Sequence, residues 1–236
     1  MKIGFIGAYD KTDLIIYIAK ILTMMKKKVL VIDNTLVQKA RYIVPVINPT
    51  KEYITEYEDI DIAVGFSNIE DIKKYLAIPN NQNLEYDYIM VDVDNIQGFE
   101  KFELKDAEKN YFVTSFDNYS LKKGLEVLSG LKEVLPFKKV LFTSQILKEE
   151  DDYLNFLSLG YKIIWDEERI YFPIENGDLN VIYENQRVAK IKFKKLSVQY
   201  KDGIGNIAEE IVGANQSSIV RKTIKSIEKG VWWCQL

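Results

Sequence analysis

The first fourteen residues hold side chains whose types and spacing could bind a phosphate group. A short apolar run, residues 2–6, is followed by Gly7 and then by Lys11 and Thr12. In a phosphate-binding loop of the form G-x-x-x-x-G-K-[ST], the glycines let backbone amides wrap the phosphates, the lysine neutralises phosphate oxygens and the hydroxyl holds Mg²⁺. Gly7, Lys11 and Thr12 are therefore the candidate nucleotide-binding residues.

Two positions of this loop depart from the pattern, because Phe5 and Asp10 stand where its two glycines belong. A carboxylate about 4 Å from a phosphate charge repels it by about 4 kcal/mol at an effective dielectric constant near 20. That repulsion lowers affinity roughly a thousandfold. Pairing of Lys11 with Asp10 would offset part of it, but would take the lysine away from the phosphate. The alternative interpretation is a helix N-terminus, capped by Thr12 or Asp13, with a solvated lysine.

Two aspartates end apolar runs further along the chain. Asp33 ends the run 29–33 and Asp92 ends the run 86–92. Ligands of open α/β sheets bind at the carboxyl ends of the strands. In a nucleotide-hydrolysing sheet, Asp33 would orient the attacking water, and Asp92 with Thr12 would hold Mg²⁺. For each aspartate alone, the alternative is a turn residue after a strand.

Apolar runs alternate with segments of helical spacing, which predicts a doubly wound, mostly parallel α/β sheet flanked by helices on both faces. We assign residues 1–213 to this domain and 214–236 to a C-terminal amphipathic helix and tail. The stretch 36–54 is predicted to wrap the sheet edge, and 183–204 to begin as a loop or helix. The predicted strands are 2–6, 29–33, 61–66, 86–92, 111–115, 139–143, 162–165 and 170–172, and the predicted helices are 13–25, 69–76, 105–110, 120–135, 150–159 and 203–212.

The composition excludes several kinds of site. The chain has no histidine and one cysteine, Cys234, which excludes imidazole catalysis, His-ligated zinc and a cysteine-held cluster within one subunit. The net charge of −3 gives no general attraction to nucleic acid, so nucleic acid is not an expected partner. We interpret the basic run 190–195 as a solvated face. There is no apolar run of about 18 residues and no signal-peptide pattern, which predicts a cytoplasmic protein.

The C-terminal residues 218–236 form a basic amphipathic pattern. Val220, Ile224, Ile227 and Val231 share one helical face, and the sequence then reaches two tryptophans. Such a pattern fits an anionic membrane surface, which predicts a peripheral location at the inner face of the cell membrane. The alternative is a last helix docked on its own domain or on a dimer partner. The membrane candidates are Ile224, Ile227, Val231, Trp232 and Trp233, and the basic residues opposite them are Arg221, Lys222, Lys225 and Lys229.

Together these motifs resemble the MinD/ParA group of ATPases with a deviant Walker-A loop. The resemblance extends over about residues 2–211 and implies ATP or ADP with Mg²⁺ as cofactors, a homodimer, a protein partner within a larger assembly and a membrane-targeting C-terminal helix. Its pieces are the loop with Lys11-Thr12, VLVID ending at Asp33, YDYIMVD ending at Asp92, and the stretches 111–128, 138–144 and 170–186, the last of which implies a loop near the nucleotide base.

The departures from that group leave two hypotheses. The family's signature lysine falls on Ile6, its second acid after Asp33 falls on Thr35, and its adenine-contacting asparagine falls near residues 143–144. This is similar to degenerate members such as TadZ and CpaE, and favours a non-catalytic or weakly catalytic protein that positions or recruits pilus, secretion, conjugation or partition machinery. The other hypothesis is an active partition or positioning ATPase in which Lys11 binds phosphate with an atypical loop.

Overall fold

The fold is built on strands rich in Val, Ile, Phe and Tyr, and the side chains of its central strands are buried on both faces, as interior parallel strands require. The computed structural model describes residues 1–47, 50–79, 82–143, 148–173 and 175–230. The strands in this part of the chain are β1 Lys2–Ile6, β2 Val29–Asn34, β3 Tyr53–Tyr57, β4 Ile60–Val64, β5 Tyr88–Val93, β6 Lys109–Ser115, β7 Leu135–Thr143 and β8 Ile163–Pro173.

The strands form one sheet in the order β3-β4-β2-β5-β1-β6-β7-β8. Every neighbouring pair is parallel except β3 with β4, which are antiparallel. Parallel neighbours carry their loops at a common edge, so the loop after β1 lies beside the ends of β2 and β5. The register pairs Asp33 with Asp92 directly across β2 and β5. The topology therefore brings the predicted loop and both predicted aspartates to one place.

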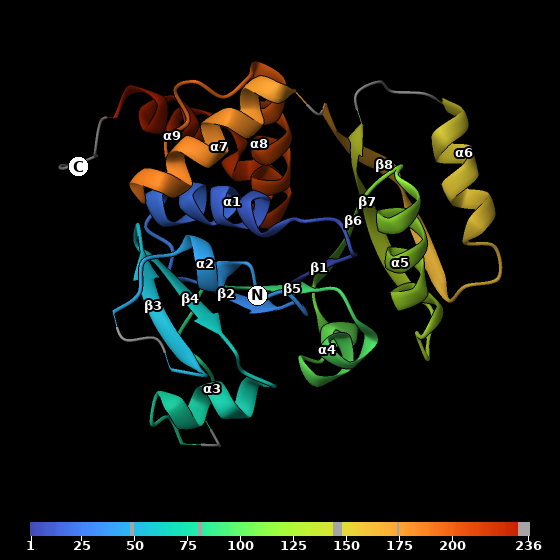
Figure 1. Ribbon diagram of the computed structural model, residues 1–236, viewed down its shortest axis with the longest axis horizontal. Coiled ribbons are helices and arrows are strands. Elements are labelled where there is room, and N and C mark those ends of the chain that lie inside the picture. Colours follow the sequence, from blue (N-terminus) through green and yellow to red (C-terminus); the bar gives the residue numbers. More distant parts are fainter. Residues whose placement is uncertain (48–49, 80–81, 144–147, 174, 231–236) are drawn as a thin grey trace.

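Helices cover both faces of the sheet, which confirms the predicted three-layer α/β/α architecture (Figure 1). One core lies between the sheet and α1, α7, α8 and α9, and the other lies between the sheet and α3, α4, α5 and α6. The helices are α1 Thr12–Met24, α2 Ala40–Ile43, α3 Ile69–Tyr75, α4 Ile96–Lys101, α5 Asn118–Ser129, α6 Lys148–Leu157, α7 Asn176–Val188, α8 Val198–Val212 and α9 Ser217–Lys229, with 3₁₀ turns at Leu104–Asp106 and Ala214–Gln216.

Helix α1 connects β1 to β2 and carries the start of the candidate site. Nearly all of it is buried, because the sheet covers one side while α8 and α9 pack on the other. Its uniformly apolar sequence reflects this double coverage. The predicted capping role of Thr12 or Asp13 is wrong: the helix begins at Thr12, and Lys11 is the N-cap without a side-chain hydrogen bond. Both side chains have partners elsewhere in the site.

Several predicted elements have different bounds in the structure. The predicted helix 105–110 is wrong, because only a 3₁₀ turn forms there and β6 begins at Lys109. Helix α4 was not predicted, although the Asn95 side chain caps it by accepting a hydrogen bond from the Gly98 amide at 2.8 Å. The predicted helix 120–135 ends at Ser129, and its last apolar residues belong to a turn and to β7.

The two sheet edges also differ from the prediction. Strand β3 begins at Tyr53, in the last two residues of the stretch 36–54 that was predicted to wrap the sheet edge, and forms an antiparallel hairpin with β4. The short strands predicted at 162–165 and 170–172 are one strand, β8, whose register with β7 shifts between Phe137 and Lys139. The charged residues within β8 lie at this irregularity, which is why the apolar pattern looked like two strands.

The C-terminal helix α9 packs on the domain. Val220 and Ile224 are buried, and they belong to the same core as α1 and α8. Gly213, at the predicted boundary after residue 213, has a left-handed φ of 92°. The separate role assigned to 214–236 stays a prediction. Within the described ranges, none of the helices has the length and apolar character that crossing a bilayer requires.

Candidate functional site

Gly7 is held by the sheet. Its amide donates to the carbonyl of Val93, at the end of β5, at 3.1 Å. Its φ is 139°, and a Cβ at this position would lie 2.1 Å from the carbonyl oxygen of Val113 on β6. Only glycine fits such a close approach between backbones. The glycine predicted to wrap a phosphate is therefore required by the packing of β1 between its neighbours, and its amide already has an acceptor.

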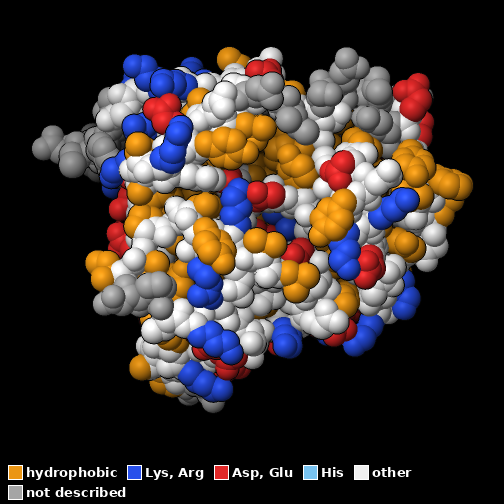
Figure 2. Space-filling view, in the orientation of Figure 1, with side chains coloured by type: hydrophobic (Ala, Val, Ile, Leu, Met, Phe, Trp, Pro, Cys, Tyr) orange, Lys and Arg blue, Asp and Glu red, His pale blue; other side chains and the backbone are white. Residues whose placement is uncertain are grey.

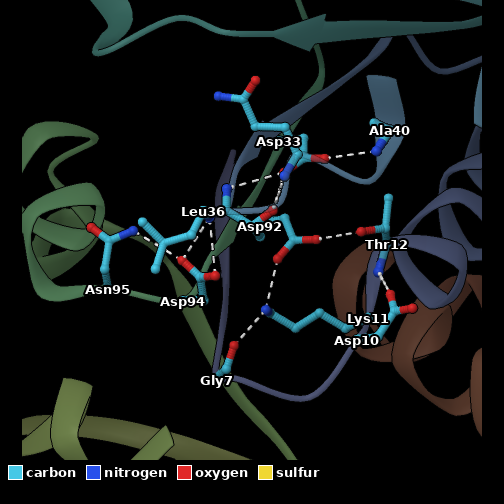
Figure 3. A network of polar contacts seen from close by, with 12 residues as sticks. Gly7, Asp10, Lys11, Thr12, Asp33, Leu36, Ala40, Asp92, Asp94 and Asn95 are labelled. Atoms are coloured by element: carbon cyan, nitrogen blue, oxygen red, sulfur yellow. Dashed lines mark hydrogen bonds and ion pairs between the residues drawn. The ribbon is translucent and has the colours of Figure 1, made fainter. Parts of the chain in front are cut away.

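Lys11 points back into the protein. Its side chain is buried, and its ammonium lies 2.7 Å from Oδ1 of Asp92 (Figure 3). The same ammonium donates to the carbonyl of Gly7 at 2.7 Å. Burying a lysine is tolerated only when its charge is paired and its hydrogens have acceptors. A phosphate would have to take this ammonium from both partners.

Thr12, Asp92 and Asp33 meet at the ends of α1, β5 and β2. The Thr12 hydroxyl donates to Oδ2 of Asp92 at 3.1 Å. Burial raises the pKa of the Asp92 carboxyl to about 6, while Lys11 lowers it and the neighbouring Asp33 raises it. Hydroxyl and carboxylate oxygens are the donors that Mg²⁺ prefers. Over the described residues, however, no three acidic side chains converge as a metal site.

Asp33 is held by the segment that follows β2. Its Oδ1 accepts hydrogen bonds from the amide and the hydroxyl of Thr35 at 3.0 and 2.7 Å, and its Oδ2 accepts from the Ala40 amide at 2.8 Å. Thr35 is the position where the family's second acid was expected. The carboxylate predicted to orient water thus has three donors from its own chain and shapes the turn between β2 and α2.

Asp10 pairs with Lys39, a residue that the sequence reading did not single out. The Lys39 ammonium contacts the carboxylates of both Asp10 and Asp13. Burial lowers the pKa of the Lys39 ammonium, but Asp13 and Asp10 outweigh burial and hold that pKa well above its usual value. Gln186 on α7 also donates to both oxygens of Asp13, at 2.9 and 3.0 Å. The charge of Asp10 is therefore neutralised by Lys39, which is 29 residues away in the sequence, and not by Lys11 as the sequence analysis considered.

A cavity of about 260 Å³ lies beside the loop, where α7 follows the end of β8. Tyr9 and Phe142 stack in its wall with ring centroids 4.6 Å apart. The stretch 170–186, predicted to lead into a loop near a nucleotide base, forms the end of β8 and most of α7, and residue 174 lies outside the described residues. The rings could stack on a flat molecule. The charged residues that line the cavity are mostly acidic, so an anionic molecule would be repelled. They are Asp10, Asp13, Glu175, Asp178 and one lysine, Lys39.

These observations test whether the site fits a nucleotide. The polyphosphate half does not fit: the Gly7 amide is donated to the sheet, Asp10 places a carboxylate on the loop and Lys11 is paired with Asp92. The metal half has suitable donors in Thr12 and Asp92. As arranged, the residues form a closed network of charges rather than a phosphate cradle.

The apolar face of α9, the helix predicted to contact a membrane, packs against the protein. Ile224 is buried and Ile227 is partly buried against the core, while Arg221 pairs with Asp202 on α8 at 2.8 Å. This is the docked arrangement named as the alternative. Figure 2 shows Lys and Arg side chains gathered at the end of the molecule where α9 lies. Lys222, Lys225 and Lys229 are exposed, whereas Val231, Trp232 and Trp233 lie outside the described residues, so their membrane role stays a prediction.

Comparison with known proteins places this geometry in context. No protein-family model matches the chain, and no curated protein matches it either. Among solved structures, a ParA family ATPase from Chlorobium tepidum TLS matches with a TM-score of 0.56 and 13% identity, covering 91% of this chain and 98% of that one. The MinC:MinD cell division protein complex of Aquifex aeolicus matches with a TM-score of 0.56 and 18% identity, covering 90% and 95%.

The structure of pNOB8 ParA gives a TM-score of 0.53 at 15% identity and covers 91% of this chain and 99% of that one. These matches extend over nearly the whole of each chain, so they concern the complete arrangement of sheet and helices. At such low sequence identity these matches are evidence for the fold alone. The chain has the P-loop fold of the ParA and MinD ATPases.

Proposed function

We propose that this protein is a non-catalytic or weakly catalytic ParA/MinD-like protein that positions or recruits a larger assembly. The observation that carries the proposal is the pairing of buried Lys11 with Asp92. Lys11, the lysine predicted to bind a phosphate, neutralises a carboxylate instead. The fold would then serve as a scaffold, and its surfaces would do the work that nucleotide turnover does in an ATPase.

The test is a calorimetric titration with Mg-ATP, run on the wild-type chain and on Lys11→Ala. The proposal expects millimolar or undetectable binding in both, because the loop amide and the lysine are already engaged. Micromolar binding that disappears in Lys11→Ala would refute it. A turnover assay with the same two proteins separates weak hydrolysis from a contaminating ATPase, since only intrinsic activity depends on Lys11.

The second candidate is an active ATPase with an atypical loop, and the metal half of the site favours it. Thr12 and Asp92 are hydrogen-bonded at 3.1 Å, and Asp33 lies beside Asp92 in register. In this reading the Lys11–Asp92 pair belongs to a resting arrangement that nucleotide binding would break. Asp33→Ala should then abolish turnover while leaving Mg-ATP binding unchanged, whereas the scaffold proposal expects at most weak turnover in the wild-type chain.

The partner of the scaffold would be a protein of the assembly being positioned. One of the matched structures is a MinC:MinD cell division protein complex, which supports a protein partner for a chain of this fold. A homodimer is proposed on the same resemblance. Sedimentation velocity over a range of concentrations, with and without Mg-ATP, measures whether the chain self-associates and whether nucleotide is needed.

We also propose that α9 brings the protein to an anionic surface from the cytoplasmic side. Lys222, Lys225 and Lys229 face solvent without an ion pair among the described residues. Near an anionic bilayer each such lysine contributes about 1 kcal/mol. The triple change of these lysines to Glu should abolish flotation with vesicles containing phosphatidylserine, and neutral vesicles serve as the control. Equal flotation of the variant would contradict the proposal.

The expectation that nucleic acid is not a partner rests on the net charge. The same triple variant tests it, because a polyanion of any kind would use the same lysines. Fluorescence anisotropy with a labelled random duplex in about 150 mM salt should show no binding by the wild-type chain. Binding that is lost in the triple variant would replace the membrane proposal with a nucleic-acid one.

A further inference from the structure

The cavity of about 260 Å³ beside the loop has walls from four separate parts of the chain. The loop after β1 contributes Tyr9, and the end of β7 contributes Phe142. Helix α7 contributes Tyr183 and α8 contributes Tyr200. Helices α1, α7 and α8 lie on the same face of the sheet (Figure 1). We call this space the loop cavity, and the scaffold function proposed above makes no use of it.

Aromatic rings form much of the wall of the loop cavity. Tyr9 stacks on Phe142 with an interplanar angle of 27°. Phe142 stacks in turn on Phe172, which meets Tyr200 at an angle of 70°. Tyr183 is 51% exposed, so part of its ring is open to a ligand. Because the face of an aromatic ring carries negative potential, such a wall attracts a cation that has an apolar body.

Two of the four carboxylates in the lining share one lysine. Lys39 contacts both Asp10 and Asp13, and it is the only Lys or Arg among the described residues that line the cavity. Gln186 also donates to Asp13, but a neutral amide leaves the charge of that carboxylate in place. One ammonium cannot neutralise two carboxylates, so this group keeps a net negative charge.

The other two carboxylates have no cation beside them. Asp178 is buried and accepts hydrogen bonds from the amide and the hydroxyl of Ser197, the N-cap of α8, at 2.6 and 2.7 Å. These donors and the helix N-terminus stabilise the carboxylate without cancelling its charge. Glu175 is exposed at the start of α7, and no described Lys or Arg side chain forms an ion pair with it or with Asp178. The lining therefore has more negative charge than Lys39 can balance.

The pKa values of two tyrosines show the sign of the resulting field. The pKa of Tyr9 is raised to about 12, first by burial. Asp10 and Asp117 raise this pKa further, and Lys39 lowers it by less. The pKa of Tyr200 is also raised, first by burial and then by carboxylates of the lining. The potential at both rings is thus negative, and Lys39 does not reverse it at Tyr9.

We propose that the loop cavity binds a small ammonium cation that carries an apolar or aromatic group. The rings contact the apolar group, and the carboxylates balance the positive charge. An aromatic wall combined with excess negative charge is the arrangement that recognises quaternary ammonium ligands. The cavity is smaller than the roughly 300–1,000 Å³ of most ligand pockets, which favours a ligand smaller than a nucleotide. This inference goes beyond the scaffold function and does not require it.

The probe is benzyltrimethylammonium, titrated into the full wild-type chain by calorimetry in low salt. Benzyl alcohol and benzoate carry the same ring without charge and with a negative charge, and they are the controls. The proposal expects the cation to bind about tenfold more tightly than benzyl alcohol, and benzoate not to bind. Higher salt should weaken binding of the cation. Equal affinity for the cation and benzyl alcohol would overturn the proposal, because the rings alone would then explain the binding.

Two variants change the charge of the lining in opposite directions. Glu175→Gln removes an exposed carboxylate and should weaken binding of the probe about threefold, as loss of an exposed ion pair does. Lys39→Gln removes the ammonium and should strengthen binding several-fold, whereas damage to the fold would weaken it. Asp152→Asn, at an exposed position of α6 outside the cavity, is the control and should bind as wild type does. Unchanged binding by Glu175→Gln, or weaker binding by a natively folded Lys39→Gln protein, would overturn the proposal.

A third variant tests whether the probe lies against the aromatic wall. Tyr9→Leu removes one ring, keeps every charge and should weaken binding about tenfold. Tyr153→Leu removes an exposed ring from α6 and should have no effect. Unchanged binding by Tyr9→Leu would place the probe elsewhere and overturn the proposal. Displacement of the probe by micromolar Mg-ATP would also overturn it, because an anion would then occupy the cavity. The titration of Lys11→Ala with Mg-ATP is read separately and decides the scaffold function.

Discussion

The two halves of the candidate site differ in what they leave for a ligand. The strand-end half contains Thr12, Asp33 and Asp92, the residues predicted to hold Mg²⁺ and to orient water, and two of the three are hydrogen-bonded to each other. In the loop half, the Gly7 amide is hydrogen-bonded to a strand of the sheet and the Lys11 ammonium is paired with Asp92. The two halves are next to each other. The strand-end half keeps groups suited to Mg²⁺, whereas the loop half does not keep groups free for a phosphate.

This difference shows that a motif residue can persist for a reason other than its motif role. Asp92 needs a cation because it is buried beside Asp33, and Lys11 supplies that cation. Gly7 is needed because a Cβ would strike Val113. Each of these residues would be required by the fold even if nucleotide were never bound. The following changes separate the structural use of each residue from its use in binding.

The largest effect is expected from Asp92→Asn. It leaves the Lys11 ammonium buried without a counter-ion, which destabilises the protein by about 3–5 kcal/mol in urea unfolding. Lys11→Met should cost less, because the pKa of Asp92 is already raised to about 6 and the carboxyl left behind can become neutral by taking up a proton. The double variant Lys11→Met/Asp92→Asn should recover most of the loss. Equal costs for the two single variants would show that the pair is not the reason these residues are needed.

The next effect is on binding and concerns the loop half alone. Asp10→Gly removes the carboxylate from the loop and frees Lys39 from one of its two partners, so Mg-ATP affinity should rise about 100-fold, close to 3 kcal/mol. Asp10→Asn, which removes the charge and keeps a side chain, is the matched control for the conformational freedom of glycine. If neither variant binds more tightly, the pairing of Lys11 with Asp92 is the dominant obstacle.

A smaller effect is expected from Gly7→Ala. The added Cβ would clash with the Val113 carbonyl, and alanine resists a φ of 139°, so the variant should lose about 2 kcal/mol of stability without any nucleotide present. Gly177→Ala, at a position on α7 with open space around a Cβ, is the control and should stay within about 0.5 kcal/mol of wild type. If the Gly7→Ala protein is as stable as wild type, packing does not require this glycine, and a role in binding phosphate becomes the better explanation.

The last effect is on the pH dependence of stability. The pKa of Asp92 is raised in the folded protein to about 6, above its ordinary value of 3.8, so the folded state holds this proton more tightly than the unfolded chain does. The resulting stabilisation is fully present below about pH 4 and is lost as pH rises through about 6. The urea midpoint of wild type, measured relative to Lys11→Met/Asp92→Asn, should fall over this window and stay flat above pH 7. An opposite slope would mean that Lys11 outweighs burial.

Much of the architecture could be read from local pattern. Apolar runs ending on Asp33 and Asp92 predicted buried parallel strands, because interior strands lack a polar face and their ends carry turn residues. Element ends were less predictable. The helix expected to continue to residue 135 stops at Ser129, and its spacing at Leu131 and Leu135 is compatible with both helix and strand. Helix α4 carried a usable signal in Asn95, a capping residue three positions before Gly98.

The pairings within the site could not be predicted in the same way. Lys39 is 29 residues from Asp10, and no spacing rule connects a lysine after one strand with a carboxylate after another. The exposure of Leu36 and Val37 could not be predicted either, because apolar side chains after a strand look like core residues, and only the structure shows Asp94 and Asp33 holding the backbone of this segment at the surface. Side chains distant in sequence meet only when the strand order has been set.

By itself the sequence determined the central strands, the α/β class and the identity of the groups at the end of β1, β2 and β5. It also determined that Asp10 stands where the phosphate-loop pattern has its second glycine. Only the tertiary structure decided which charge neutralises which: Lys11 belongs to Asp92, and Lys39 belongs to Asp10 and Asp13. The physical reason is that local pattern follows from burial along one strand or helix, whereas the partner of a buried charge depends on which elements the sheet order brings side by side.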